Sequence, residues 1–279
     1  MDTDIKLKYL RTDKLPHIWC PGCGHGIILG ALLKSFDKLG WRKDDIVVVS
    51  GIGCSGRTPG YIDANTLHTT HGRALAFATG IKMVNPKLHV VVVMGDGDAS
   101  AIGGNHLIHA ARRNIDLTAI VFNNNIYGMT GGQYSPTTPY GAKASTAPYG
   151  NIEPNFDLVE LVMGAGATYV ARATSYHEAI LEKYIQNALS HKGFSFVDVF
   201  TTCPTQFGRL NKIKSPIDNI LMLKDKTVMK SQAEKMSPEE LNGKMVIGEF
   251  RNIKDKREYT ELYDEIIKRA MNKGVGDES

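Results

Sequence analysis

Two cysteines in the segment IWCPGCGHGI, residues 18–27, have a spacing that suits metal chemistry. Cys20 and Cys23 stand two residues apart in a turn rich in proline and glycine, so two thiolates can face one metal ion or cluster. Two ligands seldom suffice, and the remaining cysteines are Cys54, in GIGCSGR, and Cys203, in TTCPTQ. In a reducing compartment, four cysteines that include a CxxC pair favour a metal site over disulfides.

Which metal these cysteines hold is open at this point. A CPxCG turn also occurs in zinc knuckles, so a structural zinc ion is one alternative. Zinc ribbons usually pair two such knuckles, whereas this chain has one and carries Cys54 and Cys203 singly in separate loops. An iron–sulfur cluster is the second alternative, and four unligated thiols are the third.

A second candidate site begins in the segment VVVVMGDGD, where an apolar strand ends on an aspartate flanked by glycines. Gly95 and Gly97 allow the backbone to approach a phosphate closely, and the N-terminus of a following helix favours negative charge. Asp96 would repel that phosphate unless a cation such as Mg²⁺ lay between them. Asn124, after the next strand, offers an amide oxygen at the same edge, and a backbone carbonyl near Ile126 could complete the coordination. The alternative is a tight turn and an asparagine-rich loop without a ligand.

The elements that must position these side chains alternate along most of the chain. Apolar strands are predicted at 45–50, 88–94, 117–122 and 193–200, and helices at 25–40, 72–84, 103–113, 156–166 and 176–189. Continuous apolar strands separated by helices imply a parallel sheet that is covered on both faces. The predicted fold class is therefore α/β, with a doubly wound parallel sheet.

The alternating pattern stops after Cys203. Residues 212–245 are rich in charge and lack a strong apolar period, and 259–271 predict one last helix. We therefore expect residues 1–204 to form an α/β domain that contains the four cysteines. Residues 205–279 are expected to form a C-terminal extension that packs on this core or on a partner subunit.

The order of these motifs resembles the β subunit of 2-oxoacid:ferredoxin oxidoreductases, which binds the diphosphate side of thiamine diphosphate. The resemblance covers residues 15–210 and rests on CPGCG, GIGCSGR, HTTHGRALAFATGIK, GDGD, NNNIYGMTGGQ and the late Cys203. Two of the segments, CPGCGHG and TGGQYSPTTP, are most similar to the 2-oxoglutarate type.

The resemblance implies oxidative decarboxylation of a 2-oxoacid, in which coenzyme A takes the acyl group and ferredoxin takes the electrons. Oxidation without hydride transfer needs a one-electron acceptor nearby, and a [4Fe–4S] cluster held by Cys20, Cys23, Cys54 and Cys203 is such an acceptor. This chemistry favours a cluster over zinc.

The resemblance also implies the residues that hold the cofactor. In the family, Mg²⁺ is ligated at positions that correspond to Asp96, Asn124 and the backbone oxygen of Ile126. The residues that would border thiamine diphosphate are Ile52, Gly53, Cys54, Ser55, His71, Gly95, Gly97, Asp98, Met129 and Thr130.

His71 and Arg57 are the two candidate catalytic side chains. His71 matches the HGR pattern of the family and could touch the cofactor or the reacting centre, whereas a buried structural histidine is the alternative. Arg57 stands where the resemblance suggests a cation for the substrate carboxylate or for coenzyme A, and a solvated arginine is the alternative. Some relatives carry a lysine at the position of Gly131, so substrate contacts of that loop are not carried over.

A missing acid predicts a partner subunit. Thiamine enzymes need a carboxylic acid beside the aminopyrimidine as a proton relay. The first glutamate of this chain is Glu153, and none accompanies a recognisable pyrimidine-side motif. We therefore expect an α subunit to donate that glutamate across an interface. The alternatives are a non-redox thiamine-diphosphate decarboxylase or carboligase with structural zinc, and an assembly subunit without chemistry of its own.

Composition excludes several other classes. The 279 residues are 42% hydrophobic and 22% charged, as in an ordinary globular protein, and the net charge of +4 is spread along the chain. This distribution gives no case for a nucleic-acid partner. The apolar runs are too short to span a membrane, and MDTDIKLKYL carries charges where a signal peptide requires apolar residues. We expect a cytoplasmic protein without a membrane partner.

Overall fold

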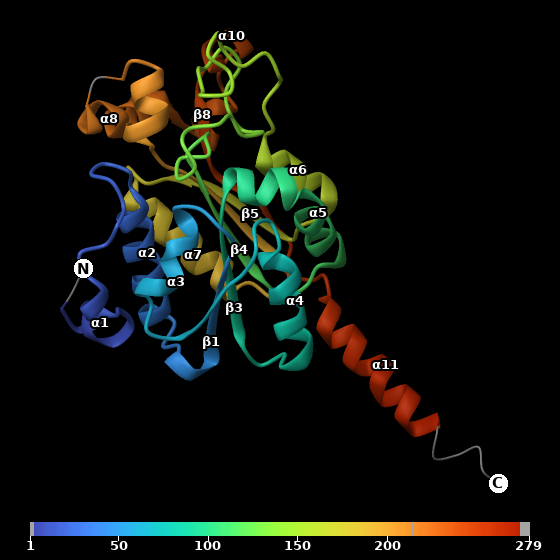
Figure 1. Cartoon of the computed structure of the whole chain (residues 1–279). Helices are drawn as coiled ribbons and strands as arrows, with labels where there is room; N and C mark the ends of the chain where they lie inside the picture. The colour runs from blue at the N-terminus through green and yellow to red at the C-terminus, as the bar shows by residue number, and fades with distance from the viewer. Residues whose placement is uncertain (1–2, 214, 274–279) are drawn as a thin grey trace.

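An eight-stranded sheet forms the centre of the computed structural model, which describes residues 3–213 and 215–273 (Figure 1). The strand order is β2–β1–β3–β4–β6–β5–β8–β7. The strands are β1 (Ile46–Ser50), β2 (Asn65–His68), β3 (His89–Gly95), β4 (Thr118–Asn123), β5 (Tyr169–Thr174), β6 (Ser195–Phe200), β7 (Thr227–Met229) and β8 (Met245–Asn252). All paired neighbours are parallel except β5 and β8, which are antiparallel. The predicted α/β fold with a largely parallel sheet is confirmed.

Helices cover both faces of the sheet, as predicted for strands that are apolar at every position. Val91 and Val93 of β3 face the helices α2 (His25–Lys38) and α7 (Glu178–Ser190). Val90 and Val92 face the opposite layer, formed by α4 (Ala74–Val84), α5 (Gly104–Arg113) and α6 (Leu158–Ala165). Two separate apolar cores therefore hold the central strands in place.

The topology places a crevice at one edge of the sheet. From β1 the chain passes to β2 on one side, whereas β3 lies on the other side of β1 and leads on to β4. Ligands of open α/β sheets bind at such a reversal, outside the carboxyl ends of the strands. The loops that follow β1, β3 and β4 meet there.

The C-terminal segment adds elements that its charged sequence did not predict. The elements that were not predicted are α8 (Pro216–Lys226), β7, α9 (Lys230–Ala233), α10 (Pro238–Leu241) and β8. Helix α11 (Tyr259–Lys273) was predicted. Strand β8 pairs directly with β5, with Gly248 opposite Arg172. The domain boundary between residues 204 and 205 stays a prediction. Of the two predicted units, residues 1–2, 214 and 274–279 lie outside the described residues.

The remaining helices are short and lie near the N-terminus and after β1. They are α1 (Thr3–Tyr9) and α3 (Thr58–Tyr61). Within the described ranges, none of the helices combines the length and the apolar character that crossing a membrane would require.

Candidate functional site

The candidate ligands at the sheet edge lie together because their strands are neighbours. Strands β3 and β4 pair with Gly95 opposite Phe122, so Asp96 and Asn124 follow at the same edge. On the other side, the backbone N–H of Gly51 donates to the carbonyl of Val93 at 3.4 Å, which brings the loop after β1 against β3. The three loops thus converge at the reversal of strand order.

A cavity of about 150 Å³ lies at this convergence. Its lining includes every residue that the sequence predicted to border the cofactor or to hold Mg²⁺, together with His25, Phe122, Tyr127 and Gly128. Arg57 is exposed and lies outside this lining. The structure therefore brings the residues predicted for thiamine diphosphate and Mg²⁺ to one place, with Arg57 outside it, and their individual roles stay predictions.

Asp96 is one of two buried acids that line the cavity. Its Oδ2 accepts hydrogen bonds from the hydroxyls of Ser135 at 2.5 Å and Thr137 at 2.7 Å. Burial raises the pKa of Asp96 to about 6, although both hydroxyls act in the opposite direction. A buried carboxylate is costly unless a cation or hydrogen bonds compensate it, so this environment suits a metal ligand. Ser135 and Thr137 lie in the segment TGGQYSPTTP, and no local pattern indicates that they contact Asp96.

Asp98 orients the candidate catalytic histidine. The Oδ1 atom of Asp98 lies 2.5 Å from Nδ1 of His71 and accepts the backbone N–H of Gly72 at 2.6 Å. Its Oδ2 is buried without a hydrogen-bond partner among the described residues, and burial raises the pKa of the Asp98 carboxyl. With Asp98 ionised, Nδ1 of His71 carries a proton, so Nε2 is the nitrogen left free for a ligand. Asp98 thus holds the His71 ring in one orientation at the cavity.

Gly97, the second glycine of GDG, cannot be replaced by a larger residue without a clash with Tyr127, apart from the room that a phosphate would need. A Cβ atom at Gly97 would lie 2.3 Å from the ring of Tyr127. The Tyr127 hydroxyl donates to the carbonyl of Gly97 at 3.1 Å. Burial raises the pKa of Tyr127 to about 12, so the phenol stays protonated and keeps this bond. Tyr127 lines the cavity but was not among the predicted site residues.

The four cysteines surround a second cavity of about 220 Å³. All four are free thiols; Cys20 is exposed, Cys23 is buried, and Cys54 and Cys203 are half-buried. Five residues line both cavities: His25, Cys54, Asn124, Gly128 and Met129. The two predicted sites are therefore direct neighbours.

Three side chains tie the CxxC turn to the loops that carry the other cysteines. Thr201 and Thr202, which follow β6, donate to the carbonyls of Cys23 at 2.6 Å and Gly22 at 2.5 Å. The indole N–H of Trp19 donates to the carbonyl of Cys54 at 2.7 Å. These three residues lie within two positions of a cysteine in the sequence, but only the structure shows that they join the loops.

A glycine next to the turn permits this contact. Gly24 has a φ of +77°, and a Cβ atom there would lie 2.5 Å from the hydroxyl oxygens of Ser175 and Thr201. Any other residue would be strained in this left-handed conformation and would push the turn away from β6. The close packing of the turn against Ser175 and Thr201 thus explains why the last residue of CPGCG, Gly24, is a glycine.

The environment of the thiols is apolar. Burial raises the pKa of the Cys23 thiol to about 12 and that of Cys54 to about 11. Within residues 3–213 and 215–273, no three His, Cys, Asp or Glu side chains are grouped so that they could hold one metal ion.

His25 lies between the two cavities. It is 2% exposed, and burial lowers its pKa to about 4, so the imidazole is neutral at ordinary pH. Its Nδ1 lies 3.3 Å from the carbonyl of Cys23. His25 was not among the predicted site residues, although its position two residues after Cys23 was a possible signal.

Comparisons with known proteins support the same interpretation. Residues 51–199 match the family model described as the C-terminal TPP-binding domain of thiamine pyrophosphate enzymes. The 2-oxoglutarate synthase subunit KorB of Methanocaldococcus jannaschii is 55% identical over 266 residues, covering 95% of this chain and 98% of that protein. The protein of the same name from Archaeoglobus fulgidus is 59% identical over 217 residues, covering 78% of this chain and 79% of the relative.

A solved structure is similar over nearly the whole chain. It is the 2-oxoglutarate:ferredoxin oxidoreductase from Magnetococcus marinus with 2-oxoglutarate, coenzyme A and succinyl-CoA bound. The TM-score is 0.84 at 33% sequence identity, and the match covers 97% of this chain and 94% of the other. The C-terminal elements after β6 therefore belong to the shared architecture.

Proposed function

The chain belongs to the family of β subunits of 2-oxoacid:ferredoxin oxidoreductases, and on this premise we propose that it binds thiamine diphosphate for the oxidative decarboxylation of 2-oxoglutarate. The acyl group would pass to coenzyme A, as the ligands named for the Magnetococcus marinus relative suggest. The observation that carries the proposal is the contact between the two cavities through Cys54 and Gly128. A decarboxylation site and an electron acceptor would then be neighbours.

The residues of the first cavity fit Mg²⁺ and a diphosphate. Asp96, the amide oxygen of Asn124 and the backbone carbonyl of Ile126 would hold the cation at the strand edge, and the cation would offset the charge of the buried carboxylate. Thiamine diphosphate, when bound, supplies the carbon nucleophile and the electron sink that decarboxylation needs. His71, held by Asp98 through Nδ1, keeps Nε2 free to hold a proton near the reacting atoms.

The second cavity fits a [4Fe–4S] cluster. Such a cluster takes four thiolates and is larger than a single ion, in agreement with a cavity of about 220 Å³ lined by four cysteines. Because burial raises the pKa of Cys23 and Cys54, thiolates there require compensating positive charge, which iron supplies. Cys20 is exposed, so electrons could leave toward ferredoxin on that side. A reducing compartment such as the cytoplasm would keep the cysteines available for iron.

An α subunit would complete the site. No glutamate is among the described residues that line the first cavity, so the acid that activates the aminopyrimidine would come from that subunit. Arg57, exposed at the end of a short 3₁₀ helix Ser55–Arg57, would bind the distal carboxylate of the substrate or coenzyme A at this interface. Residues 1–204 would form the catalytic domain, and 205–279 an extension that contacts it through β8.

The test is to purify the chain anaerobically together with its α subunit. We expect about four irons per chain and absorbance at about 400 nm. We also expect bound thiamine diphosphate and a reduction of ferredoxin that depends on coenzyme A. The kcat/KM for 2-oxoglutarate should exceed that for pyruvate. Zinc in place of iron would favour the non-redox alternative, and the absence of thiamine diphosphate would contradict the enzymatic role altogether.

A further inference from the structure

The loop that follows β4 has two sides, which face different cavities. Asn124 and Ile126, the proposed Mg²⁺ ligands, line the first cavity at the Asp96 edge. Asn123 and Asn125 line a third cavity of about 530 Å³. The residues of this loop therefore alternate between the two cavities, and Asn123 and Asn125 lie behind the side that would hold the cation.

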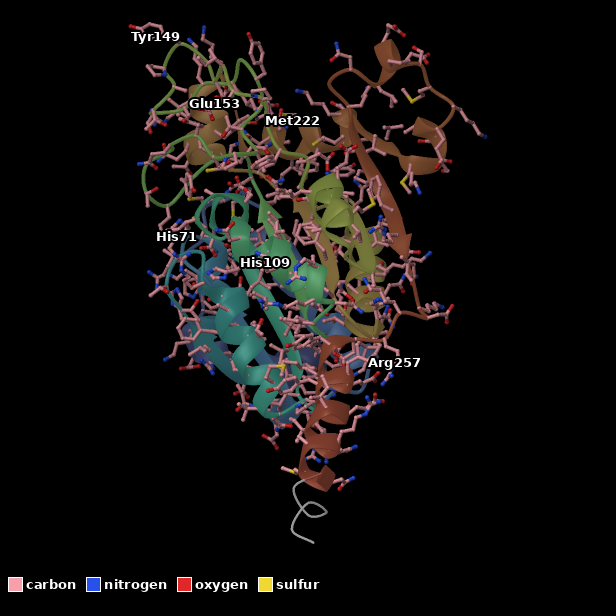
Figure 2. The ribbon with its side chains drawn as sticks, turned by 90° about the vertical axis from the view of Figure 1, so that its right-hand side faces the viewer. His71, His109, Tyr149, Glu153, Met222 and Arg257 are labelled. Atoms are coloured by element: carbon pink, nitrogen blue, oxygen red, sulfur yellow. The ribbon has the colours of Figure 1, made fainter. Side chains whose placement is uncertain are left out.

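The third cavity lies between the loop after β4 and the C-terminal segment. Its lining includes Met222 of α8, which lies at the same end of the molecule as Glu153 of that loop (Figure 2). Thr137, whose hydroxyl donates to Asp96, lines this cavity too. Both arms of the proposed Mg²⁺ site are thus supported by side chains of the third cavity.

A row of buried polar side chains crosses three strands along the wall of the third cavity. Arg172 of β5 donates through Nε to Oδ2 of Asp198 on β6 at 2.9 Å, and the two residues are direct neighbours in the sheet register. Oδ1 of Asp198 accepts the side-chain N–H of Asn123, at the end of β4, at 3.1 Å. All three side chains are buried. Buried polar networks whose members are hydrogen-bonded hold a fixed geometry, so this row is rigid.

A helix N-terminus fixes the far end of the row. Asp157 also pairs with Arg172, and it is the N-cap residue of α6. Its Oδ1 accepts the backbone N–H groups of Val159 at 2.9 Å and Glu160 at 3.1 Å. An N-cap carboxylate satisfies N–H groups that have no partner within the helix. Arg172 is therefore held between two carboxylates, and its position does not depend on the loop after β4.

At the near end, Asn123 shapes the loop with its other side-chain atom. Its Oδ1 accepts the backbone N–H of Asn125 at 3.3 Å. Asn125 has a φ of +60°, a left-handed conformation that asparagine adopts more readily than most residues. The carbonyl of Asn125 accepts the hydroxyl of Thr138 at 2.6 Å. The turn at Asn125 sets the directions of the Asn124 side chain and of the Ile126 carbonyl, so Asn123 controls both proposed ligands.

The two common divalent cations respond differently to such a rigid loop. Mg²⁺ requires oxygen ligands at about 2.0–2.1 Å in a nearly octahedral arrangement, whereas Ca²⁺ accepts about six to eight oxygens at about 2.3–2.6 Å in a flexible one. A ligand loop that is fixed from behind therefore favours Mg²⁺. Resting on the proposed function, we propose that Asn123, held by Asp198 and Arg172, is a positioning residue that makes the site prefer Mg²⁺ to Ca²⁺.

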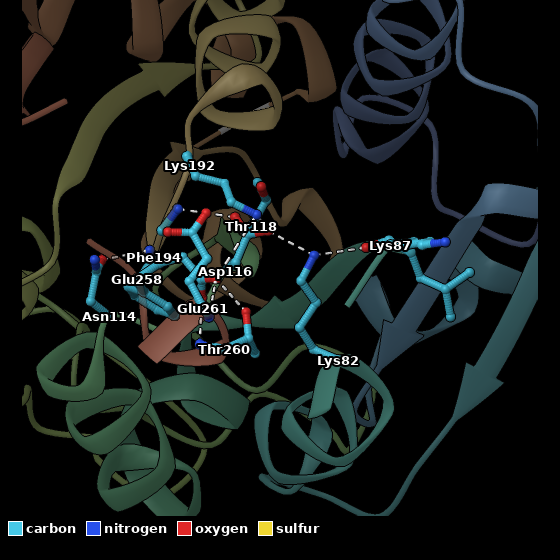
Figure 3. Close-up of polar contacts among 12 residues, drawn as sticks. Lys82, Lys87, Asn114, Asp116, Thr118, Lys192, Phe194, Glu258, Thr260 and Glu261 are labelled. Atoms are coloured by element: carbon cyan, nitrogen blue, oxygen red, sulfur yellow. Dashed lines mark hydrogen bonds and ion pairs between the residues drawn. The ribbon is translucent and has the colours of Figure 1, made fainter. Parts of the chain in front are cut away.

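The alternative is that the row only stabilises the sheet, and a second ionic cluster provides the comparison. At the opposite ends of the strands, Asp116 lies 2.7 Å from the buried Lys82 and 3.1 Å from Lys192 (Figure 3). Asp116 precedes β4, whereas Asn123 is the last residue of that strand. Asp116→Asn is therefore the control for the loss of a buried ionic contact far from the loop.

The first test compares the two cations in the αβ complex. Calorimetry measures the binding of thiamine diphosphate in Mg²⁺ and in Ca²⁺. Asn123→Ala should weaken Mg²⁺-dependent binding at least about tenfold and Ca²⁺-dependent binding less than roughly threefold. Asp116→Asn should lower the thermal stability and leave the preference for Mg²⁺ unchanged. An equal loss with both cations in Asn123→Ala would overturn the proposal.

The wild-type complex separates this role of Asn123 from the proposed function. Binding of thiamine diphosphate with neither cation in the wild type would overturn the proposed function together with the role of Asn123. Binding with Mg²⁺ in the wild type, but an unchanged preference in Asn123→Ala, would overturn the role of Asn123 alone.

The second test exchanges the two partners of the central hydrogen bond. Asn123→Asp brings a second carboxylate against Asp198, and like charges in contact repel each other. Adding Asp198→Asn restores a donor and an acceptor across this contact. The single variant should lose the preference for Mg²⁺, and the double variant should recover at least roughly half of that loss. Circular dichroism checks that both fold, and the Asn123→Ala comparison decides if Asn123→Asp does not. A double variant that binds Mg²⁺ no better than Asn123→Asp would contradict positioning through Asp198.

Discussion

Gly128 lies so close to Cys203 that a Cβ atom at position 128 would stand 3.1 Å from the Cys203 Sγ. The same atom would lie 3.9 Å from the Sγ of Cys54. Gly128 also lines the cavity at the Asp96 edge. A bare backbone thus separates the two proposed sites and leaves room for a ligand between two of the thiols.

This contact predicts that Gly128→Ala lowers the iron content of the anaerobically purified chain to less than half of the wild-type value. The methyl group would narrow the cysteine cavity, while binding of thiamine diphosphate should change less. Gly104→Ala is the matched control, since a Cβ atom there meets nothing within 4 Å. Wild-type iron content in Gly128→Ala would contradict the assignment of the cluster to this cavity.

The hydroxyl of Thr137 predicts an effect on cation binding. Thr137→Val removes a hydrogen bond to Oδ2 of Asp96 and should weaken Mg²⁺-dependent binding of thiamine diphosphate about tenfold, as is typical for groups that orient metal ligands. Asp96→Ala should abolish that binding. Calorimetry on the αβ complex measures both, with Thr79→Val in α4 as control. Unchanged affinity in Asp96→Ala would rule out its role as a ligand.

The absence of a glutamate from the described lining of the first cavity predicts dependence on the α subunit. The chain alone should hold iron but should not reduce ferredoxin with 2-oxoglutarate and coenzyme A, because the described lining of the cavity contains no glutamate that could act as the proton relay of the aminopyrimidine. Adding purified α subunit should restore turnover. A full rate from the isolated chain would show that this subunit is not needed.

Asp116 predicts a stability change that depends on pH. Burial alone would raise the pKa of Asp116, but Lys82, the Gly193 N–H and Lys192 hold the pKa below its ordinary value. Since the folded pKa is the lower one, the ion pair contributes fully above the ordinary pKa, and its contribution is lost as the pH falls through the folded pKa.

Asp116→Asn should therefore reduce the free energy of unfolding by roughly 3 kcal/mol at pH 7, because Lys82 is left buried with an unpaired charge. The difference from wild type should shrink as the pH is lowered toward 3. Urea unfolding at several pH values measures it, with the exposed Asp255→Asn as control. A loss that is independent of pH would show that the ion pair is not its cause.

The strands and helices that the sequence predicted are those with a clear local period. The apolar runs of β3, β4 and β6 and the amphipathic α2 and α7 were all found, since burial on one or both faces leaves a trace in neighbouring residues. Strand β5 was missed because Arg172 interrupts its apolar run. That arginine is buried and paired with Asp198 on β6, a partner that no local pattern reveals.

In the candidate site, too, local sequence patterns reveal some features, whereas contacts between distant residues leave no such pattern. The residue types and motif order by themselves determined which side chains could hold a cation, a diphosphate and a cluster. The contacts of Thr201 and Thr202 with the CxxC turn, those of Ser135 and Thr137 with Asp96, and the position of Arg57 outside the cavity are visible only in the folded chain. The physical reason is that periodicity and turn chemistry act between near neighbours in the chain, whereas these contacts join loops that meet only because β1, β3, β4 and β6 end along one edge of the sheet.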